Sequence, residues 1–231
     1  RAFVFFGGST GRSAAPDWMA DPTDQWNAWF GRSVASAGDV NGDGFSDIVV
    51  GSEKYDDGPN TDTGLAYLFL GSAAGPSLAP DWTANPTGQV GSEFGYSVAC
   101  AGDVNGDGFS DVVAGAYLWD GSQADEGRAY VYFGTAAGLQ ANPGWTADPT
   151  DEAGASFGLR VASAGDVDGD GRADVLVGAY HWGPTDEGRA YGFLGSTLGL
   201  STTPGWTDDP TDQASAQYAN GGAVWADVNG D

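Results

Sequence analysis

One segment of the sequence returns four times at nearly constant spacing, and this repeat limits the possible folds more than any other feature. The copies are PDWMADPTD from Pro16, PDWTANPTG from Pro80, PGWTADPTD from Pro143 and PGWTDDPTD from Pro204. A period of roughly 60 residues is typical of a repeat array, in which each unit buries one face against its neighbour. The units so defined are 16–79, 80–142 and 143–203, with partial units at 1–15 and 204–231.

Within each unit the apolar residues recur with a period of two, which predicts β-strands. The runs LAYLFLG, RAYVYFG and RAYGFLG are rich in aromatic residues, and SDIVVG, SDVVAG and ADVLVG are short apolar runs bounded by glycine. Two further strands are expected, one in GRSVASAG and its equivalents and one around each GWTADP. No segment shows a helical period over about 10–12 residues. Four short antiparallel strands per unit predict an all-β fold made of β-propeller blades.

The two ends of the chain are out of phase with these units. RAFVFFGG, at residues 1–8, matches the aromatic-rich third strand of a unit, whereas VWADVNGD stops inside a loop. We therefore expect three full blades plus partial blades at both ends. Such a chain is a segment of a larger propeller, or of a propeller that another chain completes.

A second repeated stretch carries acidic side chains at alternate positions. AGDVNGDGFSD begins at Ala37 and again at Ala101, and AGDVDGDGRAD begins at Ala164. Counted from the first aspartate of DVNGDGFSD, side-chain oxygens fall at positions 1, 3, 5 and 9, and the backbone carbonyl of position 7 can add another. Oxygen ligands on a flexible, glycine-rich loop suit Ca²⁺. Zinc would favour histidine or cysteine, and these loops contain neither.

The candidate ligands of the complete loops are Asp39, Asn41, Asp43, Phe45 and Asp47; Asp103, Asn105, Asp107, Phe109 and Asp111; and Asp166, Asp168, Asp170, Arg172 and Asp174. A fourth, partial loop supplies Asp227, Asn229 and Asp231. The pattern resembles the first half of an EF-hand loop, but Val50 and Ala114 stand where that loop has its glutamate. Solvated Asp-Gly turns are the alternative. Three copies in register with a strand repeat favour about one Ca²⁺ per complete loop.

With strand, loop and strand in place, the run FGRSVASAGDVNGDGFSDIVVGS from Phe30 resembles an FG-GAP repeat, the blade unit of the integrin alpha-subunit propeller. FGYSVACAGDVNGDGFSDVVAGAY and FGLRVASAGDVDGDGRADVLVGAY match as well, although Tyr218-Ala219 replaces Phe-Gly in the fourth unit. The resemblance implies that each calcium loop joins the first and second strands on one face of the disc. It also implies that ligands meet the opposite face, here at loops 54–64, 118–127 and 181–188.

Charge and composition exclude several classes of protein. The net charge of -24, with 32 acidic and 8 basic residues, argues against binding to nucleic acid or anionic membranes. A chain with 41% hydrophobic and 13% aromatic residues is too apolar for an acidic disordered coil. No run of about 18 apolar residues is present, so no membrane insertion is expected. Cys100 is the single cysteine and stands where the other copies have Ser36 and Ser163, which predicts a small, half-buried residue.

Nothing in the sequence indicates catalysis. His181 is the single histidine, and no serine or cysteine stands in a nucleophile-elbow motif. We expect the tryptophans of the GWTADP elements to wedge one blade against the next; these are Trp18, Trp82, Trp145 and Trp206. Trp119 and Trp182, which begin variable loops, are the candidate ligand contacts.

The sequence thus predicts a non-catalytic, calcium-binding propeller scaffold for adhesion or recognition, secreted or on the cell surface. Free calcium outside cells suits this class of site. The expected partner is a protein or glycan ligand, together with further propeller blades or other copies of the chain. One alternative is a carbohydrate-binding lectin, because an indole face can stack on a sugar ring. The other is a structural subunit of an extracellular assembly, completed by strand addition between chains.

Overall fold

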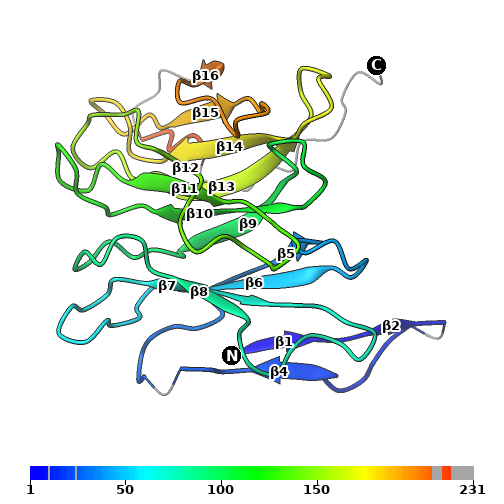
Figure 1. Cartoon of the computed structure of the whole chain (residues 1–231). Helices are drawn as coiled ribbons and strands as arrows, with labels where there is room; N and C mark the ends of the chain where they lie inside the picture. Colours follow the sequence, from blue (N-terminus) through cyan, green and yellow to red (C-terminus); the bar gives the residue numbers. More distant parts are fainter. Residues whose placement is uncertain (10, 24, 210–214, 220–231) are drawn as a thin grey trace.

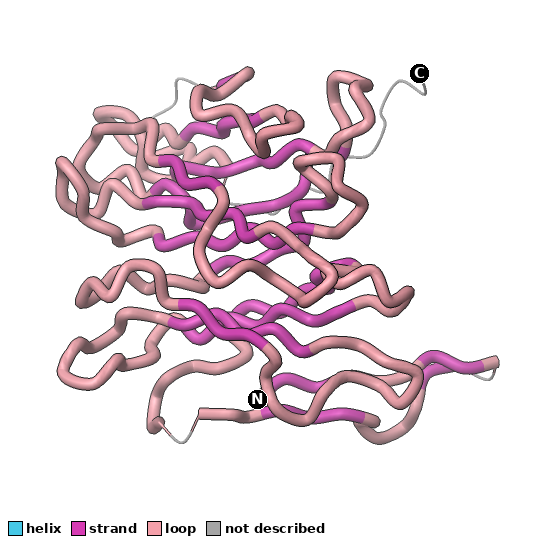
Figure 2. The backbone as a smooth tube through the Cα atoms, viewed as in Figure 1, coloured by secondary structure: helices cyan, strands magenta, loops and turns pink. Residues whose placement is uncertain are grey.

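The computed structural model describes residues 1–9, 11–23, 25–209 and 215–219, and every regular element in these ranges is a β-strand (Figure 2). The first four-stranded sheet contains β5 (Ser33–Gly38), β6 (Asp47–Ser52), β7 (Leu65–Phe69) and β8 (Trp82–Ala84). The second contains β9 (Ser97–Gly102), β10 (Asp111–Ala116), β11 (Arg128–Tyr132) and β12 (Trp145–Ala147). The third contains β13 (Phe157–Gly165), β14 (Asp174–Ala179), β15 (Arg189–Phe193) and β16 (Trp206–Asp208).

Two small sheets lie at the N-terminal end of the chain. β1 (Ala2–Val4) pairs with β4 (Trp18–Ala20), and β2 (Gly7–Gly8) pairs with β3 (Gly11–Arg12). The expected strand at 1–8 is therefore shorter than its sequence match suggested, because its last glycines belong to the β2–β3 hairpin. Among the described residues, no helix is long and apolar enough to cross a membrane.

The three large sheets are propeller blades, which confirms the predicted fold class. In each sheet the strands pair in chain order and antiparallel, and the sheets stack face to face along the molecule (Figure 1). The first strands of successive blades, β5, β9 and β13, lie next to one another. This places the first strand of each blade at the inner side of the stack and the fourth strand at the outer rim, as a propeller requires.

The tryptophan strand pairs with the strand that precedes it in the chain. The register places Leu68 opposite Trp82 and Val131 opposite Trp145. The fourth strand of each sheet therefore lies after Pro80, Pro143 or Pro204, the positions at which the next repeat unit begins. The repeat units and the sheets are out of phase by one strand, and β1 and β4 are the third and fourth strands of a preceding blade.

Aromatic wedges hold neighbouring blades together, which confirms the role expected of three of the tryptophans. The ring centroid of Trp18 lies 5.0 Å from that of Phe69 in the next blade, with the rings at 76°. The indole nitrogen Nε1 of Trp18 donates a hydrogen bond to the carbonyl of Ser77 at 2.8 Å. Trp82 and Trp145 make the same two contacts with the blades that follow them.

Glycine pairs allow the backbones of adjacent blades to meet. A Cβ atom added to Gly115 in β10 would lie 1.9 Å from the carbonyl oxygen of Gly158 in the third blade. Gly158 belongs to the Phe-Gly pair of its repeat and has a φ of +89°. Gly51 and Gly95 make the equivalent approach between the first and second blades. The Phe-Gly and Gly-Ala elements of the repeat are thus two halves of one contact between blades.

Candidate metal centres

Each acidic loop joins the first and second strands of its blade. The first runs from the end of β5 to the start of β6, and the other two connect β9 to β10 and β13 to β14. The strand register shifts beside each loop, which is a β-bulge that redirects the chain into the turn. All three loops consequently lie at one edge of the stack, on the right-hand side of Figure 1.

The aspartate at position 1 of each loop organises the turn through its carboxylate. In the first loop, Oδ1 of Asp39 accepts hydrogen bonds from the backbone N–H of Gly42 at 2.7 Å and of Asp43 at 3.1 Å. Its Oδ2 accepts one from Gly44 at 2.8 Å. These bonds hold the pKa of Asp39 below its usual value, the bond from Gly44 having the largest effect. The carboxylate is therefore ionised and fixed in place.

The aspartate at position 9 lies beneath the loop and is buried. Asp47 has no exposed surface; its Oδ2 accepts a hydrogen bond from the N–H of Val40 at 2.8 Å, and its Oδ1 accepts one from Gly71 at 2.7 Å. Gly71 follows β7, so this single side chain ties the loop to the third strand of the blade. Asp111 and Asp174 make the same pair of contacts in the other two blades.

Burial and neighbouring charge act against ionisation at position 9. Burial, with a further contribution from the nearby carboxylates of Asp107 and Asp103, raises the pKa of Asp111 to about 7, despite the lowering effect of the N–H groups of Gly134 and Val104. The pKa values of Asp47 and Asp174 are raised for the same reasons. A divalent cation at these loops would favour the ionised forms and relieve the repulsion.

The donor set of the loops fits calcium. Carboxylate oxygens of Asp166, Asp168 and Asp174 lie within 4.8 Å of one another. That spacing agrees with ligands that each lie about 2.3–2.6 Å from one shared Ca²⁺. The corresponding side chains of the first two loops are all aspartate or asparagine, so each can offer an oxygen atom to a metal ion.

The third loop contains a cation of its own. The Nη1 atom of Arg172 at position 7 donates a hydrogen bond to Oδ2 of Asp170 at 2.8 Å. Phe45 and Phe109 occupy this position in the other loops, where the neutral amide of Asn41 or Asn105 donates to the carboxylate of position 5 instead. The guanidinium of Arg172 would therefore compete with a metal ion for Asp170. The fourth loop, with Asp227, Asn229 and Asp231, lies outside the described residues.

The structure places the predicted ligand contacts Trp119 and Trp182 in stacked clusters. The guanidinium carbon of Arg128 lies 3.5 Å from the ring centroid of Trp119, and that of Arg189 lies 3.3 Å from that of Trp182. Both indoles also pack against the apolar clusters between the blades. One face of each ring is thus covered by arginine. A direct ligand role for the two tryptophans stays a prediction.

One structural residue escaped the sequence analysis, although its position repeats. The side chain of Gln25 clamps the loop after β6: its Nε2 donates to the carbonyl of Asp56 at 2.7 Å and its Oε1 accepts from the N–H of Asp56 at 2.8 Å. Gln89 makes the same two bonds to Asp120 in the next blade. A polar residue at a fixed distance after each Pro-Thr pair is the signal that could have identified these clamps.

Comparisons with known proteins agree with this geometry. The family model of the FG-GAP repeat matches residues 30–69, 94–132 and 157–193. Integrin alpha-IIb of Mus musculus is 36% identical over 162 residues, which make up 68% of this chain and 15% of that protein. Integrin alpha-5 of Xenopus laevis is 28% identical over 208 residues, 87% of this chain and 19% of that protein. The chain thus spans only a small part of the length of these relatives.

One solved structure shows a weaker likeness. Rhamnogalacturonan lyase YesW superimposes with a TM-score of 0.46 and 14% sequence identity, over 92% of this chain and 37% of the lyase chain. This similarity is too low to bear on the function of the present chain.

Proposed function

The chain belongs to the FG-GAP repeat family, and from this membership we propose that it is a calcium-binding, non-catalytic β-propeller that recognises a protein partner outside the cell. The observation that carries the proposal is the acidic loop, which recurs in three blades with the same hydrogen bonds at positions 1 and 9. Its oxygen donors and glycine turns match calcium chemistry. Free calcium outside the cell would fill sites of this class, and that supports an extracellular location.

The proposed role of calcium is structural. The position 9 carboxylate connects the loop to the third strand, so an ion bound above it stabilises the first three strands of a blade together. Without the ion, the acidic side chains repel one another and burial of the position 9 charge is unfavourable. A ligand that binds only the folded state stabilises it in proportion to the logarithm of its concentration.

A thermal melt tests this role. We expect millimolar Ca²⁺ to raise the melting temperature relative to excess chelator, and Mg²⁺ to raise it less. The matched variants are Asp107→Asn, which removes a loop carboxylate, and Asp57→Asn, which removes an exposed carboxylate outside the acidic loops. The first should reduce the calcium-dependent shift, and the second should preserve it. Equal melting temperatures with calcium and with chelator would refute the metal role.

We propose that the protein partner binds at the edge opposite the calcium loops. There the variable loops 54–64, 118–127 and 181–188 connect the second and third strands of the blades. Gln25 and Gln89 lie in the segments that lead into the first and second blades. Their side chains hydrogen-bond to the backbone of Asp56 and Asp120 and so hold the first two variable loops in place. Loops that vary in sequence on a rigid scaffold are suited to recognition.

An array of secreted and cell-surface proteins, probed with the labelled chain in millimolar calcium, tests this assignment. Replacing residues 121–125 with a glycine-serine linker should abolish binding to any protein captured by the wild type. Replacing residues 73–75, at the calcium-loop edge, serves as the matched control and should leave binding intact. Loss of binding in the control alone would place the partner at the wrong edge for this proposal.

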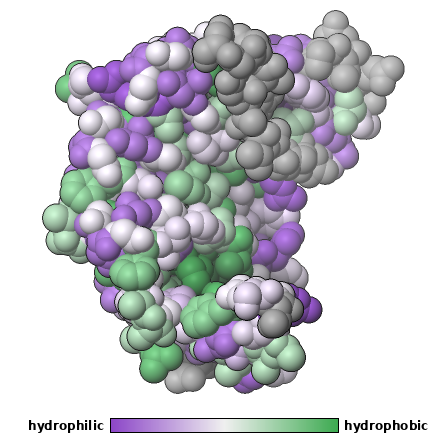
Figure 3. All heavy atoms as spheres, turned by 90° about the vertical axis from the view of Figure 1, so that its right-hand side faces the viewer, coloured by the Kyte–Doolittle hydropathy of each residue, from purple (hydrophilic) through white to green (hydrophobic). Residues whose placement is uncertain are grey.

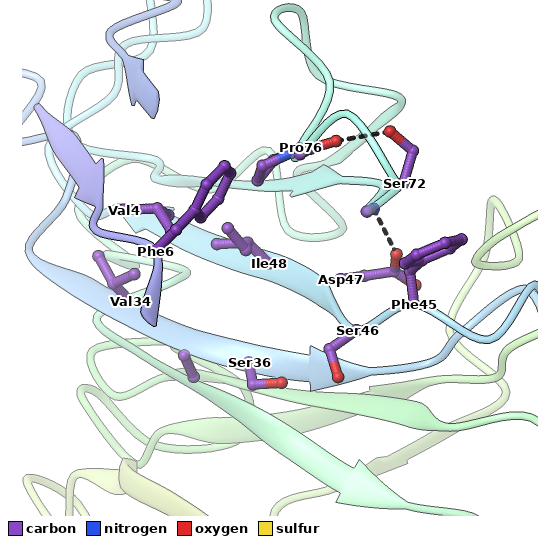
Figure 4. A pocket seen from close by; sticks show the side chains of 13 residues that line it. Val4, Phe6, Val34, Ser36, Phe45, Ser46, Asp47, Ile48, Ser72 and Pro76 are labelled. Atoms are coloured by element: carbon purple, nitrogen blue, oxygen red, sulfur yellow. Dashed lines mark hydrogen bonds between the residues drawn. The ribbon is translucent and has the colours of Figure 1, made fainter. Parts of the chain in front are cut away.

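We also propose that two further strands of the same repeat pack beside the β1–β4 sheet against the free face of the first complete blade. That face is apolar and hollowed, and Val4, Phe6, Val34 and Ile48 line the hollow (Figure 4). Figure 3, which views the calcium-loop edge, shows apolar residues gathered in the lower half of the molecule. Val34 is 49% exposed, whereas its equivalents Val98 and Val161 are 5% and 6% exposed.

The two internal junctions indicate what covers such a face. Val98 is buried in the apolar cluster that the first and second blades share. The occupant of the free face is therefore expected to be the first two strands of an FG-GAP blade, from the same polypeptide or from another copy. A melting temperature that rises with protein concentration would assign the occupant to another copy, as in the structural-subunit alternative.

A further inference from the structure

The three acidic loops lie at one edge of the stack, and the first two are hydrogen-bonded to the loop of the blade that follows (Figure 1). The backbone carbonyl of Asp39, at position 1 of the first loop, accepts a hydrogen bond from the N–H of Ser110 at 2.9 Å. Ser110 stands at position 8 of the second loop. The N–H of Ala173, at position 8 of the third loop, donates to the carbonyl of Asp103 in the second loop, also at 2.9 Å. Position 8 of one loop thus holds position 1 of the loop before it.

A second connection runs between the buried aspartates at position 9. The N–H of Gly134 donates to Oδ1 of Asp111 in the second loop at 2.9 Å. The N–H of the next residue, Thr135, donates to the carbonyl of Val40 in the first loop at 3.1 Å. The N–H of Val40 donates in turn to Oδ2 of Asp47 at 2.8 Å. Consecutive residues of the second blade therefore link the position 9 carboxylates of two loops, and the next junction repeats both bonds.

Side-chain packing reinforces the connection between loops. A Cβ atom added to Gly42, at position 4 of the first loop, would lie 2.9 Å from Cε1 of Phe109, at position 7 of the second loop. Gly106 and Arg172 are the corresponding pair in the second and third loops, with 3.1 Å between the added Cβ and Nε. Both glycines have a φ of +75°. Position 7 of one loop therefore packs on the tight turn of the loop before it.

The connecting hydrogen bond shares a peptide group with a candidate metal ligand. In the second loop, the carbonyl of Phe109 at position 7 is the candidate ligand, and the N–H of Ser110 belongs to the same planar peptide group. A peptide group is polarised when its carbonyl binds a cation, and its N–H then donates a stronger hydrogen bond. That bond fixes Asp39, whose carboxylate organises the turn of the first loop. The state of the second loop therefore acts on the first.

From these contacts we propose that the calcium sites are energetically coupled, so that occupation of one loop raises the calcium affinity of the loop in the preceding blade. The coupling rests on the calcium role proposed above and requires, in addition, the hydrogen bonds from Ser110 and Thr135. Coupling between two sites is reciprocal, so the first loop must raise the affinity of the second by the same factor. The array would then fill over a narrower range of calcium concentration than independent loops of equal affinity.

Calcium titration followed by NMR of the backbone amides tests the coupling at each loop separately. The N–H groups of Gly44, Gly108 and Gly171, all at position 6, report occupation of the first, second and third loops. Asp107→Asn removes a carboxylate of the second loop. We expect it to lower the calcium affinity of the first loop as well, by at least about fivefold, the usual lower limit for coupled sites.

The control for this variant is Asp57→Asn, which also removes one carboxylate, at an exposed position outside the acidic loops. It should leave the affinity of the first loop within about twofold of the wild type, as for sites without shared partners. Both titrations are made in about 0.5 M NaCl, where the screening length is about 4 Å. A change in long-range charge alone is then too weak to imitate the coupling.

A second pair of variants breaks a connection between the blades without touching any candidate ligand. Thr135→Pro removes the N–H that donates to the carbonyl of Val40, and it should lower the calcium affinity of the first loop. Ser72→Pro is the matched control, because Ser72 occupies the same place in the first blade. The N–H of Ser72 makes no hydrogen bond to any described residue. Its replacement should leave the affinity of the first loop unchanged.

Two results would overturn the coupling while leaving the calcium role intact. The first is an unchanged affinity of the first loop in Asp107→Asn, which would show that the loops fill independently. The second is an equal effect of Thr135→Pro and Ser72→Pro on the first loop. If Thr135→Pro does not fold, the result for Asp107→Asn decides alone. A failure of the calcium role itself would appear differently, because none of the three reporter amides would then respond to calcium.

Discussion

At the scale of single residues, the closest approach between blades depends on glycine. Gly115 faces the carbonyl of Gly158, and an added Cβ at 1.9 Å from that oxygen forces the two backbones apart. We expect Gly115→Ala to lower the free energy of unfolding by about 1–3 kcal/mol, the usual effect of overpacking. Urea denaturation in saturating calcium measures the change.

Gly7→Ala is the matched control for this substitution. Nothing lies within 4 Å of a Cβ added to Gly7. Its stability should stay within about 0.5 kcal/mol of the wild type, as for most surface changes. Equal effects of the two substitutions would mean that the Gly115–Gly158 contact does not limit the packing of the blades.

A buried glutamate predicts how stability depends on pH. Glu53 follows β6 and is 2% exposed; burial, with a further contribution from the charge of Glu93, raises its pKa to about 7 despite the lowering effect of Arg32. The folded pKa lies above the ordinary value of 4.5, so the folded state retains a proton that the unfolded state loses. Stability from this residue is therefore complete below about pH 4.5 and is lost as pH rises through about 7.

Replacing the carboxyl with an amide should remove this loss. We expect Glu53→Gln to match the wild type near pH 5 and to exceed it by about 1–3 kcal/mol near pH 8, since one pKa unit corresponds to about 1.4 kcal/mol. Urea denaturation at several pH values in saturating calcium gives the difference. Asp57→Asn, at an exposed position, should parallel the wild type. Parallel curves for Glu53→Gln as well would contradict the assignment.

Residues that repeat were easier to predict than those that depend on a neighbouring blade. The acidic loop and its position 9 aspartate follow from spacing alone, and Cys100 accepts the hydrogen bond from Gly102 that serine accepts in the other copies. The buried hydroxyl of Tyr132 in β11, which makes no hydrogen bond to any described residue, could not be found this way. Its meaning depends on which residues another blade places around it, and spacing along one chain does not contain that information.

At the scale of the element, four strands per unit were predictable, but the membership of the fourth strand was not. A tandem repeat can be divided into units from any starting position, and each division gives equally similar copies. The sequence alone therefore did not show which sheet the tryptophan strand joins. The hydrogen-bonded register assigns Trp82 to β8 of the first blade, opposite Leu68. The short hairpin β2–β3 was missed for a related reason: it has no counterpart strand in the other units.

The fourth strand carries the wedge between blades, and its removal should separate them. Trp145 in β12 is 6% exposed, packs on Phe193 and donates to the carbonyl of Ser201 at 2.9 Å. Trp145→Ala should destabilise the chain by about 3–5 kcal/mol, the usual cost of deleting a buried large aromatic ring. Trp26→Ala is the control, because Trp26 is 91% exposed. Similar losses in the two variants would exclude the wedge.

The same substitution should also alter how the blades unfold. Repeat arrays gain stability from contacts between neighbours, so a weakened junction uncouples the units on its two sides. Hydrogen exchange should therefore quicken more in β14 and β15 than in β6 and β7 when Trp145 is replaced by alanine. Uniform acceleration in all blades would mean that the three blades unfold as one cooperative unit.

At the scale of the whole molecule, three acidic clusters at one edge contribute to a net charge of -24. Raising NaCl from about 0.02 M to about 0.5 M shortens the screening length from about 20 Å to about 4 Å and weakens repulsion between exposed carboxylates. In excess chelator, we expect this change to raise the melting temperature by several degrees. In millimolar Ca²⁺ the rise should be smaller, because the bound ions already offset part of the charge of the clusters. Thermal melts at both salt concentrations, each with calcium and with chelator, give the change in melting temperature for both effects. An equal salt effect with and without calcium would show that the repulsion comes from the rest of the acidic surface, and that the loops are not its main source.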